Sequence, residues 1–234
     1  MRWSAPPVWQ DGECWIIGGG PSAPRQFGVP ESIISDVCSG RQTPAAYSDY
    51  FKPLFGAHVI GVNNAYKLGS WVDVLFFGDC SWHLSHAPAI AKWPGLKITC
   101  CPDFLYRQPG QMEGLKFLRK DPKHKNGITT DRACVAWNNN SGASAINVAV
   151  HFGVKRICLI GFDMALDKNK NSHWHGSHLL PGSTARRPLP PFARHLKGFA
   201  QISREAKILG VEILNVNTES AIVDFRKVKL KDVL

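Results

Sequence analysis

The chain has 234 residues, of which 44% are hydrophobic, and it carries a formal net charge of +10. This length and composition predict one domain over residues 1–234 with a single substantial core. No stretch approaches the roughly 18 to 20 uninterrupted apolar residues of a membrane helix, and the N-terminus lacks the apolar core of a signal peptide. We therefore expect an intracellular, cytoplasmic protein, which excludes membrane-spanning and secreted classes.

Six short apolar runs predict buried parallel strands, because they lack polar alternation and most end in Gly, Asn or Asp. In chain order they are "CWIIGG", "AHVIGVN", "VDVLFFGD", "LKITCC", "RICLIGFD" and "VEILNV". Helices are expected at 141–153, with Ser141 as a cap and Gly153 as a stop, and at 190–210, with Pro inside its start. Strands alternating with helices predict an α/β domain with a mainly parallel sheet flanked by helices.

Two segments interrupt this alternation, at 103–135 and 164–190, and both are polar and rich in turn residues. Loops of this length in a compact domain are typical of excursions or lids over a site. The second belongs to a basic stretch, since Lys168 to Arg204 contains seven Lys and Arg residues and no Asp or Glu. It predicts a basic, lid-like loop facing phosphates, although a solvated basic surface remains an alternative.

The seven cysteines form no C-x-x-C pair, and several lie in apolar runs such as "RICLIG". This usage indicates reduced, mostly buried thiols rather than a disulfide framework or a zinc site.

In a parallel α/β sheet, ligands bind beyond the carboxyl ends of the strands. The first strand ends in "GGGPSA", which fits the pattern G-x-G-x-x-A of a phosphate-binding turn. A dinucleotide site also needs Asp or Glu at the end of the second strand, but that strand ends in "GVNNAY". The sequence thus favours a different nucleotide ligand, with a tight turn without ligand as the alternative. The strand-end candidates for nucleotide binding are Gly18, Gly19, Gly20, Pro21, Ser22, Asn63, Asn64 and Asp163.

Three asparagines, Asn138 to Asn140, stand directly before the helix that begins "SGASA". Amide side chains and free helix amides can together bind a base edge, a phosphate or a ribose, or can simply cap the helix. Asn140, Ser141 and Gly142 join the nucleotide-binding candidates.

The stretch "NSHWHGSH" contains His173, His175 and His178. A histidine has an unperturbed pKa near neutrality and can act as a general base, or as a metal ligand. Cysteine is absent nearby and carboxylates are few, so we predict no metal site there, while ordinary loop histidines remain an alternative. Asp79, at the end of "VLFFGD", is a candidate to orient a base or a substrate hydroxyl, or to cap a turn.

Taken in order, "IIGGGPS", "VNNAY", "VLFFGD", "NSGASAINVAVHFGVKRICLIGFD" and the histidine-rich loop resemble the small Rossmann-like bacterial sialyltransferases that use CMP-sugars. They are also similar to a family of uncharacterised Rossmann-like proteins, common in bacteriophages, that includes an archaeal 6-hydroxymethylpterin diphosphokinase. The similarity covers roughly residues 14 to 224, including "VEILNVNTESAI".

The sialyltransferase resemblance implies that Gly18 to Ser22, Asn63 and the pair Ser141 and Gly142 surround the nucleotide. It also implies that a histidine of the late loop is the general base. That histidine is His178 if one inserted residue is allowed, and His175 otherwise.

The chain departs from the sialyltransferases at three places. Gly19 replaces an Asn, Asn138 replaces an Arg, and the tyrosines that hold the donor phosphate have no counterpart in "GFDMALDKNK". The resemblance therefore implies a nucleotide in this crevice without extending to a carboxylated sugar donor. Basic groups that could replace the tyrosines as phosphate clamps are Lys168, Lys170, Arg186 and Arg187.

These observations favour a nucleotide-dependent, glycosyltransferase-like transferase that uses a CMP-type nucleotide or nucleotide sugar and a histidine base. One alternative is pyrophosphoryl transfer from a Mg²⁺-bound nucleoside triphosphate with Asp79 or Asp163 essential. Another is a nucleotide- or nucleic-acid-binding phage protein without catalysis, and nucleic acid could also be an acceptor.

Overall fold

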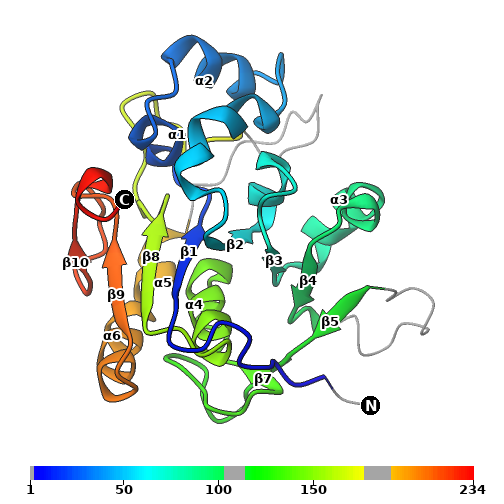
Figure 1. The fold of residues 1–234 in the computed structure, drawn as a ribbon, viewed down its shortest axis with the longest axis vertical. Helices are drawn as coiled ribbons and strands as arrows, with labels where there is room; N and C mark the ends of the chain where they lie inside the picture. The colour runs from blue at the N-terminus through cyan, green and yellow to red at the C-terminus, as the bar shows by residue number, and fades with distance from the viewer. Residues whose placement is uncertain (1–2, 103–113, 177–190) are drawn as a thin grey trace.

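The computed structural model describes residues 3–102, 114–176 and 191–234. Its centre is an eight-stranded sheet in the order β10-β9-β8-β1-β2-β3-β4-β5, in which all neighbours are parallel (Figure 1). The strands are β1 (Glu13–Ile17), β2 (His58–Val62), β3 (Val74–Phe77), β4 (Leu96–Thr99), β5 (Leu115–Phe117), β8 (Arg156–Ile160), β9 (Glu212–Asn215) and β10 (Arg226–Lys227). All six predicted strands are among them.

The central strands β1 and β8 explain the unbroken apolar runs of the sequence. They pair in register, with Ile16 opposite Leu159, and the last four residues of each are buried. A strand that is covered on both faces has no solvent side, and so it shows no polar alternation.

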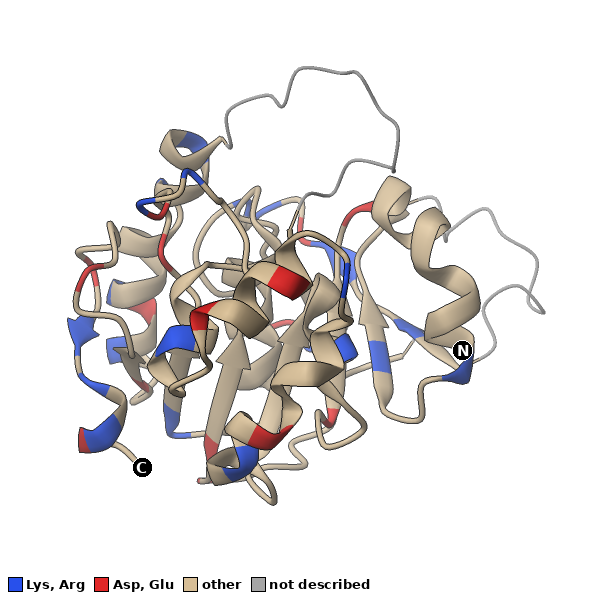
Figure 2. Cartoon of the chain, turned by 90° about the horizontal axis from the view of Figure 1, so that it is seen from above, with Lys and Arg blue, Asp and Glu red and all other residues tan. Residues whose placement is uncertain are grey.

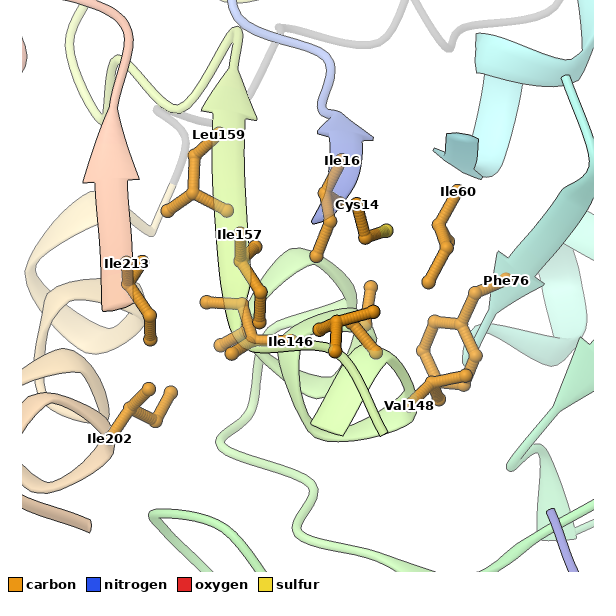
Figure 3. Close-up of a cluster of buried hydrophobic side chains, with 14 of the residues drawn as sticks. Cys14, Ile16, Ile60, Phe76, Ile146, Val148, Ile157, Leu159, Ile202 and Ile213 are labelled. Atoms are coloured by element: carbon orange, nitrogen blue, oxygen red, sulfur yellow. The ribbon is translucent and has the colours of Figure 1, made fainter. Parts of the chain in front are cut away.

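Helices cover both faces of this sheet, as Figure 1 shows. Cys14 and Ile16 of β1 belong to one core cluster, with α4 (Ser141–His151) and α6 (Phe199–Ile208). In Figure 3, Ile146 and Val148 of α4 lie beneath the strands. Trp15 and Ile17 face the opposite cluster, which includes α1 (Ser22–Gln26), α2 (Glu31–Cys38), α3 (Cys80–Lys92) and the 3-10 helices η1 (Pro44–Leu54) and η2 (Asn63–Leu68). The predicted Rossmann-like α/β class is therefore confirmed.

The helix expected at 141–153 is present as α4, but its cap is Asn140 rather than Ser141. The Asn140 Oδ1 accepts hydrogen bonds from the backbone N–H groups of Gly142 and Ala143, which places Ser141 inside the first turn. Gly153 has a φ of +90° and lies just beyond the helix, as expected of a stop.

The single helix expected at 190–210 is two helices, α5 (Phe192–Leu196) and α6. The break falls beside Gly198, which touches the Asn138 side chain. A Cβ at Gly198 would lie 2.7 Å from the Asn138 Oδ1, so this contact requires glycine. No local pattern reveals a contact between residues sixty positions apart.

Much of the segment expected at 103–135 to be an excursion or a lid contributes short strands to the fold. Residues 115–117 form the edge strand β5, and β6 (Arg119–Lys120) pairs with β7 (Cys134–Val135). The buried Asn147 side chain of α4 ties this segment down: its Oδ1 accepts from the N–H groups of Thr129 and Ala136, and its Nδ2 donates to the Thr129 carbonyl. Strands of two or three residues are too short to show a period.

The described residues leave part of the predicted basic loop untested. Residues 103–113 and 177–190 lie outside the described ranges. The second of these segments contains His178, Arg186 and Arg187. Figure 2 shows Lys and Arg on many elements, interspersed with Asp and Glu. Among the described helices, none has the length and apolar character needed to cross a bilayer.

The expectation of reduced thiols is wrong for one pair, because Cys80 and Cys101 form a disulfide. They are 21 residues apart, and the start of α3 lies beside the end of β4 with a Cα–Cα separation of 5.5 Å. A spacing this long gives no sequence signal. The described free cysteines are Cys14, Cys38, Cys100, Cys134 and Cys158, of which only Cys38 is not buried. Burial raises the pKa of Cys100 to about 12, which keeps it a neutral thiol at physiological pH.

Candidate functional site

A cavity of about 600 Å³ opens beyond the carboxyl ends of the central strands. It lies where the strand order reverses, since the chain runs from β1 to β2 on one side while β8 is paired on the other. This is the place where open α/β sheets bind ligands. The predicted site residues in its lining are Gly18, Gly19, Gly20, Asn63, Asp79, Asn140, Ser141, Gly142 and His175.

The turn after β1 requires glycine at two positions because it touches the turn after β8. A Cβ at Gly18 would lie 2.8 Å from the Gly161 carbonyl oxygen, and one at Gly20 would lie 2.5 Å from the same atom. The Gly20 N–H donates to that oxygen at 2.8 Å. Contact within the protein therefore accounts for these two glycines before any phosphate is considered.

Asp163 supports this turn from behind. Its carboxylate accepts hydrogen bonds from the Ser22 N–H (2.8 Å), the Ser22 hydroxyl (2.5 Å) and the Asn217 Nδ2 (2.6 Å). Burial raises the pKa of Asp163, and the hydrogen bonds from Ser22 and Asn217 oppose that rise. The N-terminal amide of α1 is thus already bonded to a carboxyl group of the chain itself. Pro21, Ser22 and Asp163 lie behind the cavity rather than in its lining and border a separate hollow.

Gly19 faces the late loop. A Cβ there would meet the His173 Cδ2 at 2.7 Å and the His175 Nε2 at 3.6 Å. The two imidazole rings stack with centroids 5.1 Å apart, and the Trp174 N–H between them donates to the Gly19 carbonyl at 3.0 Å. His173 therefore occupies the space next to Gly19.

The three asparagines before α4 have different roles. Asn138 is buried and bonded to the backbone of Gly127 and Ala136. Asn139 is exposed and lines the cavity. Asn140 caps α4 and is only 8% exposed, and its Nδ2 is buried without a hydrogen-bond partner within the described ranges.

Asn63 and Asn64 also have different positions relative to the cavity. Asn63 lines the cavity with a φ of +51°, and its Oδ1 is buried with no partner among the described residues. Asn64 lies behind the lining, where its Oδ1 accepts from the Trp82 Nε1 at 3.0 Å and its Nδ2 lies 3.0 Å from the His175 Nδ1. Asn64 thus contacts a histidine that lines the cavity, and its expected contact with a nucleotide stays a prediction.

Asp79 is exposed at the cavity edge and caps α3. Its Oδ1 accepts from the N–H of Ser81 at 2.9 Å and from that of Trp82 at 3.5 Å. Of its expected roles, the structure bears out the cap.

Sequence reasoning missed the contribution of α5, which brings Phe192, Arg194 and His195 into the lining. Burial lowers the pKa of His195, and the positive charge of Arg194 adds to this. The basic run through "ARH" was the available signal, but it did not indicate which of its residues face the cavity. Lys168 and Lys170 are exposed and absent from the lining, and Lys168 borders the separate hollow. Within the described ranges, no group of three or more His, Cys, Asp or Glu is arranged to hold a metal ion.

No protein-family model matches the chain, and no curated protein matches it. Solved structures share its fold, and two of them are described here. MAf glycosyltransferase from Magnetospirillum magneticum AMB-1 is 11% identical, with a TM-score of 0.56. The match covers all of the present chain and 36% of the glycosyltransferase chain. The chain thus spans about a third of that enzyme. Sialyltransferase CstII from Campylobacter jejuni, in complex with CMP-3FNeuAc, is 14% identical, with a TM-score of 0.50. This match covers 92% of the present chain and 85% of the sialyltransferase chain.

These matches confirm the resemblance of fold to the sialyltransferases. Neither bears on the similarity to the phage family or to the pterin diphosphokinase, which stays a prediction.

Proposed function

We propose that this protein is a nucleotide-dependent transferase of the glycosyltransferase type. It would bind a nucleotide-activated donor in the cavity beyond β1 and β8 and transfer the activated group to an acceptor hydroxyl. The observation that carries the proposal is the convergence in one cavity of the glycine turn, Asn63 and the start of α4, which are far apart in the sequence. The fold shared with a sialyltransferase structure that contains CMP-3FNeuAc supports it.

The lining has the chemistry that a nucleotide requires. Asn63 offers a buried acceptor and Asn140 a buried donor, each without a partner in the described structure. Buried polar groups are nearly always hydrogen-bonded in folded proteins, so such atoms beside a cavity favour a polar ligand. Arg194 and three histidines add groups suited to phosphate, against one carboxylate, Asp79.

In the transfer step, a histidine would take the proton of the acceptor hydroxyl as its oxygen attacks the sugar. The bond between the sugar and the nucleotide phosphate breaks, and the phosphate leaves with the bonding electrons. The resemblance assigns the base to His178 or His175, and of these His175 lines the cavity. General base catalysis typically contributes ~10² to 10⁴ in rate.

A thermal-shift panel of nucleotides and nucleotide sugars, with and without divalent metal, tests the proposal. A ligand at 100 times its Kd stabilises the folded state by ~2.7 kcal/mol. We expect stabilisation by CMP or CMP-sugars, and its loss in Asn63→Ala, with Lys170→Ala as the matched control outside the cavity. Stabilisation by NAD(P) alone would overturn the reading of the glycine turn.

Turnover tests the chemistry. Release of CMP from a stabilising nucleotide sugar, in the presence of an acceptor, should fall by at least ~10² in a His175→Ala/His178→Ala double variant. Unchanged release in that variant would remove the histidine base. Turnover that requires Mg²⁺ and a nucleoside triphosphate would favour pyrophosphoryl transfer instead.

A further inference from the structure

A short hydrogen-bonded chain runs from α3 to the cavity through three side chains. The Trp82 Nε1 donates to the Asn64 Oδ1 at 3.0 Å, and the Asn64 Nδ2 lies 3.0 Å from the His175 Nδ1. Trp82 and Asn64 are 7% and 6% exposed, so water does not compete strongly for these contacts.

This chain has one consistent direction. The indole nitrogen of Trp82 can only donate, so the oxygen of the Asn64 amide must face it. The amide nitrogen then faces the His175 Nδ1 and donates to it. A neutral imidazole that accepts at Nδ1 carries its proton on Nε2.

The Nε2 of His175 lies on the side of the ring that faces Gly19. It lies 3.6 Å from the position that a Cβ of Gly19 would occupy, and both residues line the cavity. Reversing the tautomer would require the Asn64 amide to turn over. Its nitrogen would then face the Trp82 N–H, which sets two donors against each other in a buried position.

We propose that His175 is a fixed hydrogen-bond donor, through Nε2–H, to the phosphate of the bound nucleotide, and that Asn64 and Trp82 are its positioning residues. The inference rests on the proposed function for the identity of the ligand, but not for the tautomer. A neutral imidazole held in this form stabilises negative charge by hydrogen bonding without transferring a proton.

This assignment changes the role of His175 in the transfer step. An imidazole whose Nδ1 already accepts from Asn64, and whose Nε2 carries hydrogen, has no nitrogen left to take a proton from an acceptor hydroxyl. His175 is then a ligand of the leaving phosphate, and the base of the transfer step is a different group.

Nitrogen-15 NMR of the histidine side chains tests the tautomer without any ligand. We expect the neutral His175, identified by its loss in His175→Gln, to carry hydrogen on Nε2. In Asn64→Asp, both carboxylate oxygens accept, one from Trp82 and one from His175, so hydrogen should appear on Nδ1. Hydrogen on Nδ1 in the unaltered chain, or an unchanged ring in a folded Asn64→Asp variant, would overturn the proposal.

Titration with CMP and with cytidine tests the phosphate contact. A hydrogen bond to a charged group is worth about 10- to 100-fold in affinity, so His175→Ala should weaken CMP by that factor and cytidine by less than about 2-fold. His175→Gln, which keeps an amide donor, should recover part of the loss. Equal losses for CMP and cytidine would indicate a merely structural role and overturn the phosphate contact.

The two experiments separate the two proposals. If the unaltered chain binds CMP no better than cytidine, the phosphate-binding part of the proposed function fails together with the phosphate contact, whatever the tautomer. If CMP is preferred but the NMR result shows hydrogen on Nδ1, the proposed function stands and the positioning chain is wrong.

Discussion

The lining of the cavity and two buried polar side chains outside it, called the supports below, satisfy their polar groups differently. The supports are Asp163 and Asn147, and each of their polar side-chain atoms is bonded within the chain. Asp163 bonds to Ser22 and Asn217. Asn147 bonds to Thr129, Ala136 and His151. In the lining, Asn63 and Asn140 each keep one buried polar atom without a partner in the described structure.

This difference distinguishes residues that contribute to stability from residues that are suited to ligand binding. A polar residue that completes its hydrogen bonds within the chain contributes to folding, whereas one that leaves a group open beside a cavity is suited to a ligand. Both kinds come from the same short motifs, so residue type alone does not distinguish them. Substitutions in the supports should therefore lower stability, and substitutions in the lining should lower affinity.

The sharpest test uses two asparagines of the same helix region. Asn147→Ala leaves two buried backbone N–H groups, of Thr129 and Ala136, without an acceptor, and should reduce the free energy of unfolding by about 2 to 5 kcal/mol. Asn140→Ala removes a helix cap and should cost only about 1 kcal/mol, while weakening nucleotide binding. Urea denaturation of both variants measures the difference, and equal losses would break the comparison.

Two glycines of one turn provide the second test. A Cβ at Gly20 would press on the Gly161 backbone, which cannot move away, so Gly20→Ala should cost about 1 to 3 kcal/mol of stability. A Cβ at Gly19 would meet the ring of His173, a side chain that can rotate. Gly19→Ala should therefore unfold near the urea midpoint of the unaltered chain and bind CMP more weakly. A larger stability loss for Gly19→Ala than for Gly20→Ala would contradict this.

The sequence predicted the architecture well because buried parallel strands leave continuous apolar runs. "CWIIGG" and "RICLIGFD" are β1 and β8, and their ends meet at the cavity as the strand-end rule requires. The edge strands were missed because β5 has three residues and β10 has two. The disulfide was missed because its spacing has no signature.

The strand ends predicted where the cavity lies, but not which of their residues line it. Strand ends identified Asn63, Asn64 and Asp163 together, yet only Asn63 lies in the lining. The separation depends on side chains distant in sequence: Trp82 turns Asn64 toward His175, and Asn217 helps to hold Asp163 behind the turn. Likewise, no sequence signal indicated that Arg194 of α5 lines the cavity.

The pH dependence of stability offers a smaller effect that isolates one support. Burial raises the folded-state pKa of Asp163 above its ordinary value of 3.8, so the folded chain retains a proton that the unfolded chain has lost. Stability attributable to this group therefore falls as pH rises above about 4, until the folded-state pKa is passed. One such group changes the free energy of unfolding by at most about 1.4 kcal/mol per pH unit.

Asp163→Asn removes this titration and preserves the shape of the side chain. The difference in unfolding free energy between the unaltered chain and Asp163→Asn should therefore shift in favour of the variant as pH rises from about 4. Urea midpoints of both proteins, measured across that range, give the comparison directly. A difference that shifts in favour of the unaltered chain would mean that the hydrogen bonds from Ser22 and Asn217 outweigh burial.

The smallest expected effects separate basic groups of the lining from those of the surface. Arg194 lines the cavity and Lys170 does not, although both are exposed and both belong to the basic run. A solvated charge about 4 Å from a phosphate contributes about 1 kcal/mol in water, so Arg194→Ala should weaken CMP binding by about 5-fold at low salt. Lys170→Ala should change the affinity for CMP by less than about 2-fold. Added salt should reduce the effect of Arg194→Ala because exposed charges are screened.

Isothermal titration of CMP into the unaltered chain and both variants, at two salt concentrations, measures these changes in affinity. A salt-insensitive loss in Arg194→Ala would show that the arginine is desolvated by the nucleotide, and an equal loss in Lys170→Ala would show that the whole basic run, rather than the lining, attracts the phosphate.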